Sequence, residues 1–315
     1  MINKKKLLES NHIPSRRFCI APMMRWSDKH CRFFWRQITQ HAMLYTEMVT
    51  IGAIIHSNPE RLLEFNNDEH PLALQLGGSS PTDLARCSKI AESWGYDEIN
   101  LNCGCPSNRV QNGMFGACLM AHPLRVAECI KAMQDACSIP VTIKHRIGID
   151  EMDNYHELVD FMLPIMDSGC KTFIIHARKA CLQGLSPKQN REVPPLDYTT
   201  VYKLKRDFPA IEIIINGGIT DLEQSFKHLQ YVDGVMLGRA AYQNPYLLAK
   251  VDEYIYGKDC SKGYDKHTSK SYNNHSNVDM TKSRDQILLS FLLSVEKQLI
   301  KRVHLNHITR HILGL

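Results

Sequence analysis

Short runs of apolar and β-branched residues recur along the chain, and segments with the spacing of amphipathic helices lie between them. Such runs are typical of strands that a parallel sheet buries on both faces, and the crossover between parallel strands is usually a helix. Eight strand–helix units predict an α/β protein with the (β/α)8 architecture of a TIM barrel. The expected strands are Phe18–Ala21, Leu44–Thr46, Leu72–Leu76, Glu98–Asn102, Val141–His145, Thr172–His176, Glu212–Asn216 and Val235–Gly238.

The barrel is expected to occupy residues 13–256, because the pattern changes on either side of that range. Residues 1–12 are polar and charged, which predicts a flexible N-terminus. Residues 257–284 are rich in Lys, Ser, Asn, Asp and Gly, as in a polar linker or a long surface loop. Residues 285–315 begin with an apolar segment of helical spacing and end in basic and imidazole side chains, so we expect a small C-terminal helical domain.

Composition favours a folded enzyme without membrane segments. Apolar residues make up 43% of the chain and charged residues 23%, which excludes wholesale disorder. No apolar run reaches the roughly 18 residues of a transmembrane helix, and the N-terminus lacks the apolar core of a secretory signal. The 11 cysteines are scattered through a chain too large for a disulfide-stapled module, so we expect a reduced, cytoplasmic protein. The net charge of +5 is compatible with a nucleic-acid partner but too small to indicate one.

Most of the expected strands end in polar residues or glycine, at the edge of a TIM barrel where active sites lie. After the strand that ends at Asn102, a Gly-Cys-Pro turn places Cys105 over the barrel mouth. An arbitrary cysteine mostly packs in a core, but the flanking Gly104 and Pro106 favour a functional thiol here. Zinc binding by Cys103 and Cys105 is a weaker alternative, because a closed zinc site needs a second pair of ligands.

Basic side chains gather at the ends of the fifth and sixth expected strands. Lys144 and Arg146 are two residues apart on one strand, so they share an orientation. They are either two solvated bases or, if they point into the barrel mouth, ligands for an anionic cofactor or a phosphate. His176 ends the next strand and Arg178 opens its loop, a position equally compatible with a structural and a functional histidine.

Glycine loops follow the last two expected strands, at Asn216-Gly217-Gly218-Ile219 and at Leu237-Gly238-Arg239-Ala240. Backbone amides in such loops bind phosphate, and the loops after strands 7 and 8 form the common phosphate site of TIM barrels. The sequence has neither the G-x-G-x-x-G dinucleotide fingerprint nor a P-loop. A mononucleotide flavin therefore fits this barrel mouth better than a resident NAD or ATP.

Motifs at these positions resemble those of the tRNA-dihydrouridine synthases, most closely the branch that modifies positions 20 and 20a of tRNA. The resemblance covers about 17–248 and resumes at 307–315, and the segment 184–197 carries the branch signature. The shared motifs are Ala-Pro-Met-Met at 21–24, Leu-Gln-Leu-Gly-Gly at 74–78, Asn-x-Asn-x-Gly-Cys-Pro at 100–106, Lys-His-Arg-Ile-Gly at 144–148, His-Ala-Arg-Lys at 176–179 and Asn-Gly-Gly-Ile at 216–219.

The resemblance implies a reductase that binds FMN at the barrel mouth, takes NADPH as a transient reductant and acts on uridine in tRNA. It implies that Cys105 is the catalytic acid and that Asn102 and Arg178 hold the target base. Arg146 is assigned to the substrate as well, and Lys188 and Arg191 to the RNA. The expected FMN contacts are Pro22, Met23, Met24, Gln75, Lys144, His176, Asn216, Gly217, Gly218, Gly238 and Arg239.

This chemistry agrees with the residues. Reduction of the uracil C5–C6 bond needs a hydride at C6, which the flavin supplies, and a proton at C5. A thiol with a pKa of about 8.5 is still largely protonated at neutral pH and can donate that proton. The base has to leave the RNA stack, at a cost in unstacking energy. Lys144 is expected to stabilise negative charge that develops on the flavin or on the base.

The final helix is expected to hold the tRNA backbone through Lys301, Arg302 and Arg310. Three histidines between 304 and 311 have the spacing of one helix face and imitate a metal site, but RNA-facing or structural histidines are the preferred interpretation. Members of the family usually continue beyond residue 315 with an arginine-rich segment, so this helical domain is expected to be shortened here.

Two other functions are compatible with parts of the sequence. A dihydroorotate-type dehydrogenase is an FMN barrel that acts on the same bond of a free pyrimidine, but it has no use for a basic helical domain. A non-catalytic RNA-binding protein with a barrel fold would not require Cys105, Gln75 and the glycine loops together. We therefore expect a monomeric tRNA-modifying enzyme with no metal site and no stable protein partner.

Overall fold

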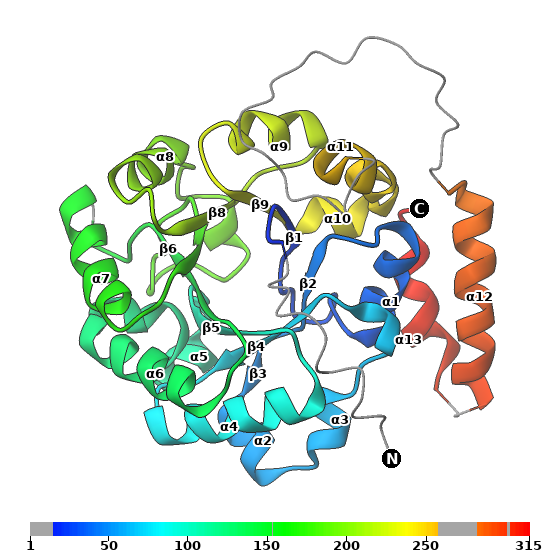
Figure 1. Ribbon diagram of the computed structural model, residues 1–315, viewed down its shortest axis with the longest axis horizontal. Helices are drawn as coiled ribbons and strands as arrows, with labels where there is room; N and C mark the ends of the chain where they lie inside the picture. Colours follow the sequence, from blue (N-terminus) through cyan, green and yellow to red (C-terminus); the bar gives the residue numbers. More distant parts are fainter. Residues whose placement is uncertain (1–14, 153, 258–281, 301–302) are drawn as a thin grey trace.

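The strands form one closed barrel in the computed structural model, which describes residues 15–152, 154–257, 282–300 and 303–315 (Figure 1). All pairings are parallel, and the barrel closes because β2 pairs with both β1 and β4. The eight expected strands all form, so the predicted TIM barrel is confirmed; β3 is an additional two-residue strand beside β4. The strands are β1 (Phe18–Ile20), β2 (Met43–Tyr45), β3 (Val49–Thr50), β4 (Leu72–Gly77), β5 (Glu98–Cys103), β6 (Val141–Arg146), β7 (Thr172–His176), β8 (Glu212–Asn216) and β9 (Gly234–Leu237).

Helices surround the barrel, as Figure 1 shows. Their ends follow local sequence signals: Ser80 caps α4, Pro81 is its first residue, and Gly95 ends it with a left-handed φ of 91°. The barrel helices are α1 (Lys29–Ile38), α2 (Ile51–His56), α3 (Pro59–Leu63), α4 (Pro81–Trp94), α5 (Asn108–Asn112), α6 (Pro123–Ala136), α7 (Tyr155–Asp167), α8 (Tyr198–Asp207), α9 (Leu222–Leu229), α10 (Arg239–Gln243) and α11 (Val251–Tyr256).

The barrel interior is filled with side chains. Its N-terminal end holds a buried charge cluster in which the Glu98 carboxylate accepts hydrogen bonds from Arg16, from the Tyr45 hydroxyl at 2.8 Å and from the Thr142 hydroxyl at 2.6 Å. Arg16 also pairs with Glu212 at 3.0 Å. Because Glu98, Thr142 and Glu212 lie at the starts of β5, β6 and β8, this cluster closes the end of the barrel opposite the predicted active site. The apolar residues that fill the interior are Cys19, Ala21, Met43, Tyr45, Ala73, Ile174, Ile214 and Met236.

Among the described residues, three helical segments follow the barrel at the C-terminal side: α12 (Arg284–Ile300), α13 (Leu305–Thr309) and the short 3-10 helix η6 (Arg310–Ile312). The apolar face of α12 packs on α1, where the ring of Phe291 lies 5.1 Å from that of Phe34. The expectation of one continuous basic helix is wrong, because His304 has an extended backbone and caps a separate helix, α13. The histidines between 304 and 311 therefore do not share a single helix face.

Several expectations fall wholly or partly outside the described residues. These are the N-terminus at 1–12, most of the polar segment 257–284, and the RNA contacts of Lys301 and Arg302. The expected domain boundaries stay predictions. In the part of the chain that the structure describes, none of the helices has the length and apolar character required to cross a membrane.

Candidate active site

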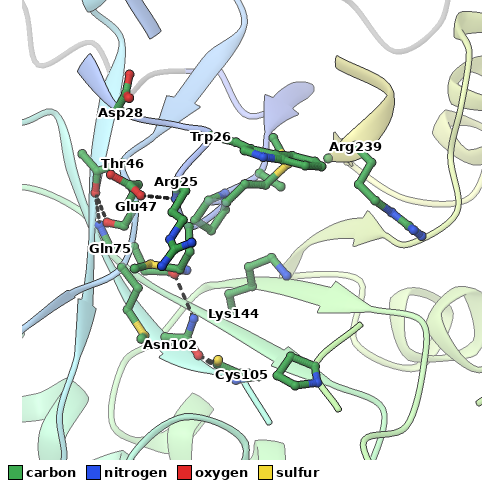
Figure 2. A pocket seen from close by; sticks show the side chains of 18 of the residues that line it. Arg25, Trp26, Asp28, Thr46, Glu47, Gln75, Asn102, Cys105, Lys144 and Arg239 are labelled. Carbon is green, nitrogen blue, oxygen red and sulfur yellow. Dashed lines mark hydrogen bonds between the residues drawn. The ribbon is translucent and has the colours of Figure 1, made fainter. Parts of the chain in front are cut away.

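The C-terminal ends of the strands open into a cavity of about 1610 Å³, shown from close by in Figure 2. Most of the residues predicted to form the site line it together. Arg178 and Lys188 lie outside its lining, and Arg302 is outside the described residues. The predicted residues in the lining are Pro22, Met23, Met24, Gln75, Asn102, Cys105, Lys144, Arg146, His176, Arg191, Asn216, Gly217, Gly218, Gly238, Arg239 and Arg310.

Cys105 is held at this cavity by the side chain of Asn102. The Asn102 carboxamide oxygen accepts the backbone N–H groups of Gly104 at 3.1 Å and of Cys105 at 3.0 Å, and its amide nitrogen donates to Gln75 at 2.8 Å. The thiol is half-buried, with its Sγ 3.7 Å from the hydroxyl of Ser107. Cys103 is fully buried, and burial raises the pKa of its thiol well above the ordinary value. Of these two cysteines, Cys105 is therefore the one placed to react with a ligand.

Lys144 lies on the floor of the same cavity, where its Nζ donates to the side-chain oxygen of Asn216 at 3.0 Å. Burial, with the nearby cation of Arg146, lowers the pKa of Lys144 to about 7. The same causes, burial first and then the Arg146 and Lys144 cations, lower the pKa of His176 well below its usual range. The site therefore holds a neutral imidazole beside a lysine that is poised to gain or lose a proton near neutral pH.

Arg146 was expected to contact the substrate, but in the structure its guanidinium N–H groups donate hydrogen bonds to backbone carbonyls of the protein. They reach the carbonyl oxygens of Gly104 at 3.0 Å, of Lys179 at 3.1 Å and of Asn190 at 2.8 Å. The side chain is 3% exposed, and burial lowers its pKa to about 10. Arg146 thus ties the loop of Cys105 to the loop after β7; its contact with substrate stays a prediction.

The loop after β7 crosses the edge of the mouth and carries Lys188 and Arg191, both exposed. Arg178 donates to the carbonyl oxygen of Glu192 at 3.2 Å and to that of Pro194, so it also holds this loop. The carboxylate of Glu192 pairs with Arg239 at 3.0 Å. The Arg239 guanidinium, which is predicted to bind the cofactor, thus has a carboxylate partner from the loop.

Glycine is required at two positions of the expected phosphate site. Gly217 has a φ of +119°, and a Cβ there would lie 2.7 Å from the His176 ring. Gly218 has a φ of +71°, and a Cβ there would lie 2.5 Å from Leu196. At Gly238 a Cβ would meet the nearest atoms at 3.7 Å, which is ordinary contact. The Gly217–Gly218 turn therefore requires glycine, because its φ angles are positive and neighbouring side chains occupy the space that a Cβ would need.

Comparison with known proteins decides the family. A sequence model described as "Dihydrouridine synthase (Dus)" matches residues 19–315. The chain belongs to this family. It is similar to the tRNA-dihydrouridine(20/20a) synthase of Shewanella oneidensis, with 54% identity over 99% of this chain and 87% of that protein. It is also similar to the enzyme of that name from Pseudomonas aeruginosa, with 53% identity over 96% of this chain and 85% of that protein.

Among solved structures, an old yellow enzyme homologue from Zymomonas mobilis matches with a TM-score of 0.55 over 75% of this chain and 88% of that chain. The two are 11% identical, so this likeness concerns the barrel fold alone. The predicted resemblance to the dihydrouridine synthases is confirmed. Like the other members of the family, this chain is a flavin-dependent oxidoreductase.

Sequence reasoning missed part of this family member's cavity wall. Arg25 and Trp26, in the loop after β1, and Glu47, in the loop after β2, all line the cavity. Arg25 has a left-handed φ of 66°, and its backbone N–H donates to the Glu47 carboxylate. A non-glycine residue in that conformation is uncommon and occurs often at functional sites. The signal available in the sequence is position: these residues directly follow the ends of the first two strands.

Proposed function

We propose that this chain reduces the C5–C6 bond of uridine in tRNA, at positions 20 and 20a, with FMN bound at the barrel mouth and NADPH as the transient reductant. Identity above 50% to tRNA-dihydrouridine(20/20a) synthases supports the substrate. The observation that carries the proposal is the placement of the Cys105 thiol in one cavity with Lys144 and the Gly217–Gly218 turn. An acid, a cation and a phosphate-binding turn in one cavity are the parts that such a reduction requires.

The residues of the mouth fit a mononucleotide flavin. Gly217 and Gly218 line the cavity in a turn of positive φ, the kind of glycine loop whose backbone amides bind phosphate. The cavity also offers amide and ammonium groups of the kind that flavin ring carbonyls and nitrogens accept. The residues that would hold FMN are Pro22, Met23, Met24, Gln75, Lys144, His176, Asn216, Gly217, Gly218, Gly238 and Arg239.

When bound, the flavin supplies the hydride that C6 of the uracil accepts. The chain supplies the proton: Cys105 holds it at Sγ and delivers it to C5. Asn102 positions the thiol through the two backbone N–H groups that it accepts, and Gln75 orients Asn102. Ser107, whose hydroxyl lies 3.7 Å from Sγ, can relay a proton from solvent back to the thiolate.

Lys144 completes the electrostatics of the reaction. Because the pKa of Lys144 is lowered to about 7, an anion bound in the cavity favours protonation of this side chain. The resulting ammonium group then stabilises the anion. Arg146 acts through the loops that it holds. The neutral imidazole of His176 has one donor and one acceptor nitrogen for a ligand that needs both.

The RNA is proposed to lie over the mouth and to contact Lys188 and Arg191, which the loop after β7 exposes. Arg178 and Arg302 are further proposed contacts. Arg310 was expected to contact the RNA as well, but it is paired with Asp28 at 2.6 Å, so we propose that it attaches the C-terminal segment to the rim instead. We also propose that the protein acts in the cytoplasm as a monomer. The cysteines in the described part of the chain are all free, which agrees with a reducing compartment.

The test is reconstitution. Purified protein is expected to be yellow and to release FMN on denaturation, and with NADPH it should convert uridine to dihydrouridine in tRNA from cells that lack the modification. Mass spectrometry of tRNA fragments locates the product. A protein that binds no flavin even after FMN is added would refute the proposed function. Conversion of free orotate or uracil but not of tRNA would assign the site to a free pyrimidine.

A further inference from the structure

An aromatic surface lies on the side of the cavity opposite Cys105. Trp26 is half-buried and lines the cavity, and its indole ring stacks on the ring of Tyr242, with centroids 4.4 Å apart and planes 8° from parallel. Tyr242 is not part of the cavity lining, so it covers the indole from behind. Figure 2 shows Trp26 beside Arg239, with Lys144 between them and Cys105. The indole is therefore presented to the rim of the cavity, away from the reacting thiol.

The backbone around Trp26 is fixed before any ligand arrives. The Met23 carbonyl accepts the N–H groups of Trp26 at 3.0 Å and of Ser27 at 2.9 Å, and the Met23 N–H donates to the Ser27 hydroxyl at 2.8 Å. The left-handed conformation of Arg25 between them is held through its N–H bond to Glu47. An aromatic ring on such a tight turn loses little conformational freedom when it binds a ligand.

The C-terminal segment supports the same rings from behind. The imidazole of His311 meets the edge of Tyr242 at 5.7 Å, and its Nε2 lies 3.1 Å from the Asp28 carboxylate. Arg310 pairs with that carboxylate at 2.6 Å. Asp28, two residues after Trp26, is also the N-cap of α1. The stack of Trp26 and Tyr242 is thus braced by His311, which is 283 residues from Asp28 in the sequence.

Basic side chains line the same cavity as the indole. Arg25 is exposed, and the Arg239 side chain is 42% exposed while it pairs with Glu192. A rigid aromatic face among exposed cations is the arrangement with which proteins hold single-stranded nucleic acid, because bases stack on the ring while cations attract the phosphates.

We propose that Trp26 is a stacking platform for a nucleobase that neighbours the target uridine in the RNA. This inference rests on the proposed function and names a further contact of that substrate. A base that leaves the RNA stack exposes the faces of its neighbours, and the platform replaces one of those lost stacking contacts. Trp26 thereby lowers the cost of presenting the uridine to the cavity.

The test compares three substitutions. Trp26→Leu keeps apolar packing against Tyr242 but removes the π face, and Trp26→Phe keeps a π face. Tyr231→Ala is the matched control, because Tyr231 is 55% exposed and stacks on Tyr202 at 4.4 Å outside the mouth. We expect kcat/KM for tRNA to fall about ten- to a hundredfold in Trp26→Leu, less than about threefold in Trp26→Phe, and to stay unchanged in Tyr231→Ala.

A direct readout uses tRNA that carries the fluorescent base 2-aminopurine beside the target uridine. Wild-type protein and Trp26→Phe should quench it on binding, and Trp26→Leu should not. Equal kcat/KM and equal quenching in Trp26→Leu would refute the platform while leaving the proposed function intact. A rise in the FMN dissociation constant of Trp26→Leu as large as its loss in kcat/KM would also overturn the inference, because it would assign the ring to the flavin. A wild-type protein that forms no dihydrouridine would instead refute the proposed function.

Discussion

Arginines at the barrel mouth and in the C-terminal segment are held in different ways. Arg146 at the end of β6 is 3% exposed and donates to three backbone carbonyls in two loops. Arg310 in η6 has a side chain that is 39% exposed and pairs with one carboxylate, that of Asp28. The first arginine shapes the cavity from inside, and the second attaches a helical segment to its rim.

The acceptors around a basic residue thus decide its role. Both arginines were expected to contact substrate, yet the guanidinium group of each donates hydrogen bonds to other groups of the protein. Removing a buried donor leaves its acceptors unsatisfied, whereas an exposed ion pair can be replaced by water. Substitutions at the mouth should therefore have larger effects than substitutions in the C-terminal segment, and the following predictions test that order.

The largest effect is expected for Cys105→Ala. Loss of the proton donor should lower dihydrouridine formation about a hundredfold or more, while bound FMN and NADPH oxidation remain. Cys103→Ala is the control: it removes a fully buried sulfur, so it should lower the melting temperature slightly but keep the activity of the folded protein. Quantification of dihydrouridine by mass spectrometry and of flavin by absorbance checks both. Product yields equal to wild type in Cys105→Ala would assign the proton to another group.

Arg146→Lys should have the next largest effect. Lysine keeps the charge but cannot donate to three carbonyls in two loops at once, so the Cys105 loop and the loop after β7 lose their common anchor. We expect activity on tRNA to fall about tenfold or more and the melting temperature to fall by several degrees. Calorimetry and steady-state kinetics measure the two. A variant with wild-type stability and a changed salt dependence of RNA binding would instead indicate direct RNA contact.

A smaller effect is expected from the titration of Lys144. Its pKa of about 7 means that the side chain is a cation at lower pH and neutral at higher pH. Affinity for anionic FMN should therefore weaken as pH rises through 7, up to about tenfold if the bound anion raises this pKa by about one unit. Fluorescence titration of FMN between about pH 6 and 9 measures the change. Lys144→Gln corrects for titration of the ligand itself, and an identical slope in that variant would exclude Lys144 as the cause.

The smallest effect is expected for Arg310→Ala. Because Arg310 is paired with Asp28, its loss should lower the melting temperature by a few degrees at most and leave the salt slope of tRNA binding unchanged. Lys188→Ala, on the exposed loop after β7, should instead reduce that slope by about one unit. Binding titrations at several salt concentrations measure both slopes. A loss of one unit for Arg310→Ala would show that RNA replaces Asp28 as its partner, and the comparison between the two regions would then fail.

The sequence was sufficient to predict the barrel and the position of its mouth. Apolar runs mark strands because both faces of those strands are buried, and the change to polar residues marks their C-terminal ends. For the same reason the position of Cys105 and the glycine turns at 217 and 238 could be predicted. The two-residue strand β3 could not, because Val49–Thr50 is too short to show a pattern.

Contacts between distant segments could not be predicted. Nothing in the sequence near Arg146 indicates that its guanidinium donates to the carbonyls of Gly104 and Asn190. These residues become its neighbours only when the barrel closes. The pairing of Asp28 with Arg310, 282 residues apart, has the same origin. Trp26 was missed because its role depends on the ring of Tyr242 behind it.

The charge cluster of Arg16, Glu98 and Glu212 at the far end of the barrel has a kinetic consequence. With that end closed and the interior filled, the cavity floor can be reached only from the mouth. In the proposed function two bulky reactants, a nicotinamide nucleotide and an RNA, both need the floor and would have to visit it in turn. Rates measured against one reactant at several fixed concentrations of the other should give parallel lines in a double-reciprocal plot, the signature of double-displacement kinetics.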